Sequence, residues 1–260
     1  MFEELKSRLS EIWSSAPWEN VAPQLAPIHE HIVRVLRPAP GMRWLDVATG
    51  TGAVATLAAR AGADVTGIDL APGLIGTARR LAAEQGLEIR FETGDAEALP
   101  VEDASFDAVS SSMGLIFAPD HAAVSRELAR VTKPGGRIAF SAWYAHSCFR
   151  PVTLKYTPQP KLGQGDSDDW ADRAYVERML GDAFELSFEE GDSPITGESG
   201  ETLWELMLTS AGPMKARAET LEPEQLETLH REFVELLESH RTNGGIHLPG
   251  PYLLVVGTRR

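Results

Sequence analysis

Residues 46–52, DVATGTG, decide the fold of this chain. They follow an apolar run, RWLDVA at 43–48, and precede an alanine-rich stretch at 53–61 that has the composition of a helix. Glycines in such a turn let the backbone approach a ligand without Cβ clashes, and the helix N-terminus that follows offers unpaired N–H groups. A glycine-rich turn between a strand and a helix serves several kinds of ligand, so by itself it does not identify one.

Strands and helices alternate on both sides of this turn. We expect strands at 43–48, 64–69, 88–93, 106–112 and 137–143, and helices at 53–61, 72–85 and 120–132. KPGG at 133–136 is expected to form a turn before the fifth strand. This alternation predicts an α/β fold, in which right-handed crossovers build a doubly wound, mostly parallel sheet with helices on both faces.

The remaining segments are less regular. Residues 1–40 carry five prolines, which predict short helices joined by kinks, and 145–170 has no clear period and is expected to be a long loop or lid. Helices are expected at 171–180, 201–211 and 223–241. The segment 251–260, PYLLVVGTRR, is expected to form a final strand, with 183–189 as its partner.

An acidic side chain stands at the end of each of the first three predicted strands. Asp46 belongs to the first, Asp69 ends the second, and Asp95 comes just after the third, in GDAEALP. An acidic residue ending the second strand of such a fold meets ribose hydroxyls, and ligands bind at the carboxyl edge of the sheet. The three acids together with the glycine turn therefore predict a nucleoside site at that edge.

Composition narrows the possible partners. The net charge of −14 disfavours nucleic acid and anionic membrane surfaces. The single cysteine, Cys148, excludes an intrachain disulfide and a multi-cysteine metal site, and no metal site is expected. The N-terminus is charged and amphipathic, and no apolar run reaches transmembrane length. We expect a cytoplasmic protein; the sequence does not indicate its oligomeric state.

The motifs DVATGTG, GIDL, GDAEALP, FDAVSSSMGLIF and ELARVTKPGGRIAFSAW resemble, in order and spacing, those of class I S-adenosylmethionine-dependent methyltransferases. Within them the chain is most similar to the small-molecule enzymes of the ubiquinone and menaquinone biosynthesis type. The match covers roughly residues 40–143. The resemblance implies a seven-stranded sheet with an antiparallel last strand and helical lids. It also implies S-adenosylmethionine as methyl donor, S-adenosylhomocysteine as product and a small-molecule acceptor.

The resemblance also implies roles for individual residues. Those that would wrap the methionine and ribose portions of the donor are Asp46, Ala48, Gly50 and Gly52. Asp69 would bind the ribose hydroxyls, with Leu70 against the adenine. Asp95 and Ala96 would contact the adenine amino edge, and Ser111 would face the methionine portion. Ala48 stands where many members of the family have a glycine.

Methyl transfer from a sulfonium is an in-line displacement that needs alignment, and it needs a base only if the acceptor must lose a proton. Tyr144 and His146 follow the fifth strand and are the candidate catalytic residues, with a solvent-exposed loop histidine as the alternative for His146. Trp13 and Trp18 are candidates for a lid. Trp170, Trp204 and Met207 are candidates for an apolar acceptor wall, and Arg150 for pairing with an acidic acceptor. His29 and His31 point in different directions on a helix.

We treat 1–260 as one methyltransferase domain. It comprises an N-terminal helical lid at 1–39, a donor-binding core at 40–143, an acceptor-side lid with helices at 144–242 and the final strand region at 243–260. Two alternatives remain: a nicotinamide-dependent oxidoreductase and a non-catalytic nucleoside-binding protein. The chain has no Tyr-x-x-x-Lys pair, which disfavours one common oxidoreductase type, and GDAEALP favours the methyltransferase.

Overall fold

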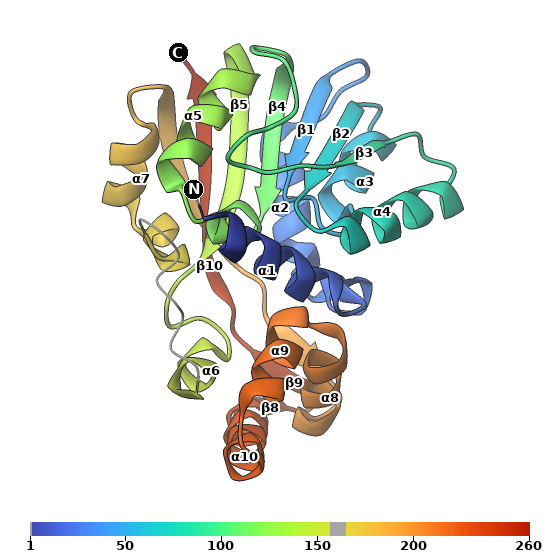
Figure 1. Ribbon diagram of the computed structural model, residues 1–260, viewed down its shortest axis with the longest axis vertical. Helices are drawn as coiled ribbons and strands as arrows, with labels where there is room; N and C mark the ends of the chain where they lie inside the picture. Colours follow the sequence, from blue (N-terminus) through green and yellow to red (C-terminus); the bar gives the residue numbers. More distant parts are fainter. Residues whose placement is uncertain (1, 157–164) are drawn as a thin grey trace.

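A computed structural model describes residues 2–156 and 165–260 of the chain. The described residues form a seven-stranded sheet with helices on both faces and a smaller lobe beneath it (Figure 1). In spatial order its strands are β3 (Arg90–Thr93), β2 (Asp64–Asp69), β1 (Arg43–Val47), β4 (Phe106–Ser112), β5 (Thr132–Trp143), β10 (Pro251–Arg259) and β6 (Phe184–Asp192).

The sheet is parallel except for one strand. β3, β2, β1, β4 and β5 pair in parallel with their neighbours, whereas β10 pairs antiparallel with both β5 and β6. The predicted doubly wound sheet with an antiparallel last strand is confirmed, as is the pairing of the last strand with the segment near 183–189. Because β1, β2 and β4 are parallel, the loops after them open on the same edge, and the strand order reverses at β1, where such sheets bind ligands.

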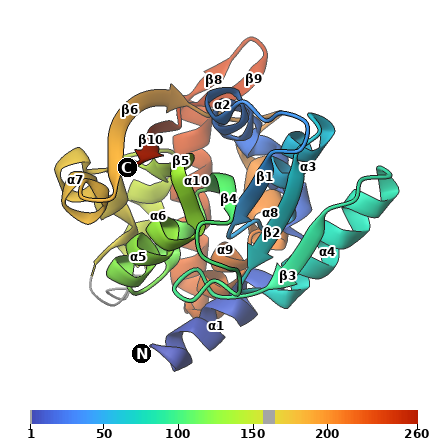
Figure 2. The same cartoon turned by 90° about the horizontal axis from the view of Figure 1, so that it is seen from above.

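The helices cover the two faces in separate groups (Figure 2). α2 (Ala26–Leu36), α3 (Ala53–Arg60) and α4 (Pro72–Glu84) bury their apolar sides against one face. α5 (His121–Val131) and α7 (Arg173–Leu180) cover the other. Val and Ile side chains of the central strands are almost fully buried between these layers, as is usual for a parallel sheet covered by helices on both faces.

The N-terminal segment crosses the carboxyl edge of the sheet. α1 (Glu3–Ser14) is followed by two 3₁₀ turns, Trp18–Asn20 and Ala22–Leu25, before α2 begins. These are the short, kinked helices that the prolines predict. α1 contacts α4 of the main layer and α9 of the smaller lobe, and it lies beneath the parallel strands in Figure 1.

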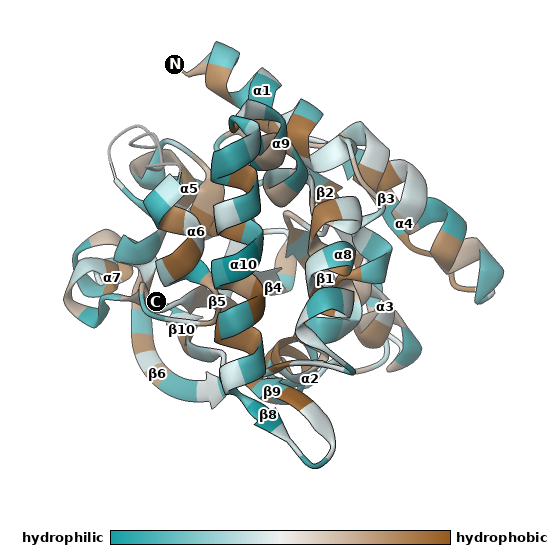
Figure 3. Ribbon diagram, turned by 90° about the horizontal axis from the view of Figure 1, so that it is seen from below, coloured by the Kyte–Doolittle hydropathy of each residue, from teal (hydrophilic) through white to brown (hydrophobic). Residues whose placement is uncertain are grey.

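The smaller lobe has its own apolar core. Its helices are α6 (Arg150–Tyr156), α8 (Gly200–Ser210), α9 (Gly212–Thr220) and α10 (Pro223–Ser239). A three-stranded sheet of β7 (Ile195–Gly197), β9 (Gly245–Leu248) and β8 (Arg241–Thr242) completes it. Figure 3 shows α8 and α10 from below; α10 buries Leu229, Phe233 and Leu237 completely in this core.

Three features differ from the sequence expectation. KPGG forms no separate turn: it lies within β5 as an irregularity, and Gly135 takes a left-handed φ of 76° there. The segment 145–170 contains α6 and the start of a 3₁₀ turn at Ser167–Ala171, although residues 157–164 of it lie outside the described residues. α9 and the small sheet had no counterpart in the prediction.

Candidate functional site

The turn from Ala48 to Gly52 follows β1 at the carboxyl edge of the large sheet. Its backbone is left-handed at alternate residues, with φ of 52° at Ala48, 57° at Gly50 and 83° at Gly52. Glycine adopts this conformation freely, whereas it costs an alanine about 1 kcal/mol. Gly52 has a second constraint, because a Cβ there would lie 2.7 Å from the ring of Phe91. The path of the turn therefore depends on its two glycines.

Asp46 anchors this turn from inside the protein. Its Oδ2 accepts a 2.6 Å hydrogen bond from the Thr49 hydroxyl, and its Oδ1 accepts one of 2.6 Å from the Ser110 hydroxyl. The carboxyl group is 1% exposed, and this burial raises its pKa to about 6, against the lowering effect of the hydrogen bonds. Asp46 thus joins β1, its turn and β4 in one buried network.

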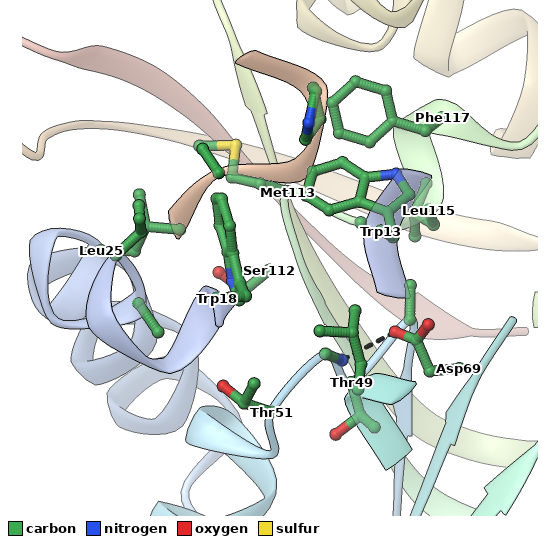
Figure 4. A pocket seen from close by; sticks show the side chains of 18 of the residues that line it. Trp13, Trp18, Leu25, Thr49, Thr51, Asp69, Ser112, Met113, Leu115 and Phe117 are labelled. Atoms are coloured by element: carbon green, nitrogen blue, oxygen red, sulfur yellow. Dashed lines mark hydrogen bonds between the residues drawn. The ribbon is translucent and has the colours of Figure 1, made fainter. Parts of the chain in front are cut away.

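Asp69 fastens the ends of two neighbouring strands. Its Oδ2 accepts from the Gly50 backbone N–H at 2.8 Å (Figure 4), and its Oδ1 accepts from the Ala71 N–H at 2.9 Å. Burial raises the pKa of this carboxyl group, although both N–H donors oppose the shift. Each carboxylate oxygen still has acceptor capacity, since an ionised carboxylate offers about four lone-pair sites.

Asp95 is held by the N-terminal helix. The Lys6 ammonium group of α1 lies 2.6 Å from Asp95 Oδ2 and 2.5 Å from Glu97 Oε2. Burial lowers the pKa of Lys6, but its hydrogen bonds to the two carboxylates outweigh that effect and leave the pKa raised. This ion pair fixes α1 over the loop that follows β3. No feature of the sequence indicated the contact, because Lys6 and Asp95 are far apart along the chain.

A chain of aromatic rings lies over the same edge of the sheet. Trp13 packs edge-on against Trp18, with ring centroids 5.2 Å apart, and against Phe117 at 5.5 Å (Figure 4). Trp18 also reaches the glycine turn, because its Cδ1 would lie 3.9 Å from a Cβ at Gly50. Trp13 and Trp18 therefore occupy the place expected of a lid.

The end of β4 presents a buried polar atom without a protein partner. The Ser112 hydroxyl oxygen is inaccessible to solvent and has no hydrogen-bond partner in the described part of the chain. Such a group is costly to bury unless a ligand or water completes it. Ser112 lines the cavity formed by the turn, the two carboxylates and the aromatic rings, so its free hydroxyl is an observation in favour of a bound ligand.

These features surround one cavity of about 300 Å³, which is within the range of small-molecule sites. Most of the residues predicted to bind a donor line it: Asp46, Ala48, Gly50, Asp69, Leu70, Asp95 and Ala96. An adenosyl amino acid needs a carboxylate for its ribose diol and another for the amino edge of its adenine. It also needs a glycine turn that the ligand can approach closely and a polar group such as the unpartnered Ser112 hydroxyl. The residues present therefore fit such a ligand.

Two residues predicted to bind the donor do not line the cavity. Gly52 packs behind the turn against Phe91 and caps α3. Ser111 points to the opposite face of β4, where its hydroxyl accepts a hydrogen bond from the Leu115 N–H. Because side chains alternate along a strand, Ser112 takes the position expected of Ser111. The alternation of side chains along the strand FDAVSSS places Ser110 and Ser112 on one face and Ser111 on the other, which is the signal that the sequence offered.

The candidate catalytic residues Tyr144 and His146 are not among the residues that line the cavity. Their rings stack on each other with centroids 5.6 Å apart, and His146 is exposed. Burial raises the pKa of Tyr144, and the negative charge of Glu190 adds to the shift. The Ser147 hydroxyl donates to the Pro251 carbonyl and holds their loop. We therefore assign neither residue a role at this cavity.

The predicted apolar wall is only partly present. Met207 lines the cavity, whereas Trp204 is buried beside it in the core of the lobe. Trp170 lies in the core on the α5 and α7 face of the sheet, where it packs edge-on against Phe140 at 5.4 Å. Trp170 thus stabilises the fold and does not contact the cavity.

His29 is a cavity residue that the sequence did not indicate. It lines the cavity from α2 and is 7% exposed, and burial lowers its pKa to about 4, so its imidazole is uncharged at neutral pH. His31 points elsewhere, as expected, and its ring bonds Tyr252 and Glu189. The apolar stripe of α2 offered a signal for burial of His29, but none for the cavity.

The lobe contributes two arginines to the cavity, Arg150 from α6 and Arg217 from α9. Arg150 forms an ion pair with Asp168, and its Nε is buried without a hydrogen-bond partner among the described residues. Around them the wall is apolar, with Phe149, Met207 and Met214. Arg150 was expected to meet an acidic group; Arg217 was missed because α9 was not predicted.

Two other kinds of feature are missing from residues 2–156 and 165–260. These residues contain no group of three or more His, Cys, Asp or Glu side chains placed to hold a metal ion. None of their helices is both long enough and apolar enough to span a membrane.

Comparison with known proteins places the chain in a family. Residues 45–140 match the family model of a methyltransferase domain. A demethylmenaquinone methyltransferase of Thermus thermophilus is 38% identical over 179 residues, which cover 68% of this chain and 69% of that protein. The chain belongs to the class I S-adenosylmethionine-dependent methyltransferases.

Two further comparisons show how far the likeness extends. An uncharacterised protein of Mycobacterium tuberculosis is 37% identical over 175 residues, 66% of this chain, and the chain spans 64% of that relative's length. The YcgJ protein of Bacillus subtilis has a similar solved structure, with a TM-score of 0.62, 20% identity, and coverage of 89% of this chain and 97% of that one. The fold that the chain shares with this structure therefore extends beyond residues 45–140.

Proposed function

We propose that this cavity binds S-adenosylmethionine and that the protein transfers its methyl group to a small-molecule acceptor by in-line displacement. One observation carries the proposal: three strand-end carboxylates, Asp46, Asp69 and Asp95, converge with a left-handed glycine turn on a single cavity. The name of the Thermus relative, a methyltransferase of demethylmenaquinone, supports a small acceptor.

In this proposal the donor's adenosine lies along the loops after β2 and β3. Asp69 accepts from the ribose hydroxyls through the acceptor capacity that its two backbone contacts leave, and Leu70 packs against the adenine. Asp95 and Ala96 contact the amino edge of the adenine, and Asp95 keeps its ion pair with Lys6. Because α1 carries Lys6, the same helix covers the adenine.

The methionine portion lies along the turn after β1. Ala48 and Gly50 give it backbone contact, and the Ser112 hydroxyl gains the partner that the protein does not supply. Asp46 holds the turn in place from beneath through Thr49 and Ser110. When bound, the donor supplies a methyl group activated by a positively charged sulfonium, so the protein's task is alignment.

The aromatic rings and His29 shape the reacting space. Trp13, Trp18 and Phe117 exclude water, and ring faces attract a cation in a site shielded from solvent. His29 is uncharged at neutral pH, so its imidazole can form a hydrogen bond with an acceptor in the cavity, while a pKa of about 4 makes it a weak base. In this proposal His29 is the histidine that meets the acceptor, because it lines the cavity and His146 does not.

Calorimetric titration with S-adenosylmethionine, S-adenosylhomocysteine and NAD tests the proposal. We expect one-to-one binding of both adenosyl compounds and none of NAD. Binding of NAD without either adenosyl compound would overturn it in favour of an oxidoreductase. Turnover is tested by incubating the protein and labelled S-adenosylmethionine with extracts of small metabolites; label must move to an extract component, and no transfer to any fraction would favour a non-catalytic nucleoside-binding protein.

A further inference from the structure

The cavity has two chemically different ends. The donor end is formed by the strand-end loops and is rich in carboxylates. The lobe end is formed by α6, α8 and α9 and combines the guanidinium groups of Arg150 and Arg217 with the apolar side chains of Phe149, Met207 and Met214. This second end lies beyond the residues assigned to the donor, so it is the place left for the acceptor.

The two guanidinium groups lie near each other in a partly buried setting. Burial lowers the pKa of Arg217, and the positive charge of Arg150 lowers it further. An arginine stays protonated in proteins despite such a shift, so two like charges face the same apolar space. Two guanidinium groups at one apolar cavity wall favour an anionic ligand over a neutral or cationic one.

Asp168 does not complete the hydrogen bonding of Arg150. The Oδ1 atom of Asp168 accepts a hydrogen bond from Nη2 of Arg150, while the buried Nε of Arg150 has no partner among the described residues. A buried N–H without an acceptor is costly, so the site has an unfilled requirement for an oxygen atom. Guanidinium groups bind carboxylate and phosphate oxygens in pairs, which makes an anionic group the matching ligand.

We propose that the acceptor is an amphipathic anion, whose carboxylate or phosphate group is bound by Arg150 and Arg217 while its apolar body packs on Phe149, Met207 and Met214. The inference rests on the proposed function, because it identifies the acceptor of that same cavity. It names an acceptor class that the donor-binding residues leave open. The two arginines then select acceptors with an anionic group, and the apolar side chains select acceptors whose remaining part is apolar.

The test uses three probes with the same eight-carbon chain: octanoate, octyl phosphate and octan-1-ol. Each is titrated calorimetrically into the full-length protein saturated with S-adenosylhomocysteine. We expect at least one of the two anions to bind about tenfold or more tightly than octan-1-ol, and the better anion distinguishes a carboxylate from a phosphate acceptor. Equal binding of anions and alcohol, or no binding of either anion, overturns the proposal.

Variants identify the residues responsible. Arg217→Gln and Arg150→Gln are expected to weaken anion binding about tenfold or more and to leave octan-1-ol binding unchanged. Arg217→Lys keeps the positive charge but loses the planar guanidinium group, so its affinity for the anions should lie between those of the wild type and Arg217→Gln. Arg231→Gln is the matched control, since Arg231 is exposed on α10 in the same lobe. Anion affinities unchanged in both glutamine variants overturn the assignment.

Failure of the proposed function gives a different result. S-adenosylhomocysteine affinity is measured for every variant, and it should match that of the wild type because neither arginine lies at the donor end. If the wild type does not bind this compound, the donor assignment fails, whatever the anions do. Thermal unfolding confirms that each variant is folded before its affinities are compared.

Discussion

Replacing Asp69 with alanine tests the donor site at its most specific contact. The two oxygens of Asp69 each accept one backbone N–H, from Gly50 at 2.8 Å and from Ala71 at 2.9 Å, and each retains capacity for one ribose hydroxyl. A hydrogen bond to a charged group is worth about 1.5–3 kcal/mol. Losing the pair should therefore cost at least about 1.5–3 kcal/mol, or about 10- to 150-fold in the dissociation constant.

Calorimetry with S-adenosylhomocysteine measures this loss. The matched control is Asp64→Ala, because Asp64 is an exposed aspartate at the opposite end of the same strand, β2. Its affinity should equal that of the wild type. Asp69→Ala removes a buried carboxylate but leaves two N–H groups without an acceptor, so thermal unfolding must show that the variant is folded. A folded Asp69→Ala protein with wild-type affinity would refute the assignment of Asp69 to the ribose.

Three further predictions follow from individual residues. Ala48→Gly should raise the free energy of unfolding by about 1 kcal/mol in chemical denaturation, since Ala48 has a left-handed φ of 52°; a loss of stability would contradict the strain. The pKa of Asp46 is raised to about 6 from 3.8, so its contribution to stability is present at low pH and lost as pH rises through about 6. Asp46→Asn should therefore be more stable than the wild type at pH 7.5, by at most about 3 kcal/mol, with no gain at pH 4; a pH-independent difference would contradict this. Lys6→Met removes the ion pair with Asp95, so backbone amides of α1 should exchange hydrogen faster while those of α10 stay unchanged; equal exchange in α1 would show that Lys6 does not hold the lid.

Much of the donor side follows from the sequence for a physical reason. Parallel strands end on one edge of a sheet, so acids that end consecutive strands must converge, and Asp46, Asp69 and Asp95 do. The final strand was also predictable, because an apolar run as long as PYLLVVGTR needs burial on both faces. The sequence therefore predicted a site at the carboxyl edge of the sheet, but not the directions of all its side chains.

The structure and the sequence predictions differ where a residue's direction depends on contacts distant in sequence. Tyr144 and His146 follow β5 but do not line the cavity, although Trp143 and Cys148 on either side of them do. A one-residue shift separates Ser111 from Ser112, and in a strand it reverses the face. These outcomes are set by packing between segments, which local patterns do not encode.

The acceptor side was the least predictable part. Helix α9, GPMKARAET, has little amphipathic pattern, and its position depends on contacts with α1 and α8. The strands β7, β8 and β9 are short and become regular only by pairing with one another. Arg217 reaches the cavity from α9, and His29 reaches it from α2. Both positions depend on how helices pack together, so neither residue could be assigned from its neighbours in the sequence.

A crystal structure with S-adenosylhomocysteine bound tests the central claim most directly. The account predicts that the ribose hydroxyls contact Asp69, the adenine amino edge contacts Asp95 and Ala96, and the methionine portion lies beside Gly50 and Ser112. The space facing Arg150 and Arg217 should remain outside the donor. A ligand bound with its ribose away from Asp69, or with its adenine against the lobe arginines, would contradict the account.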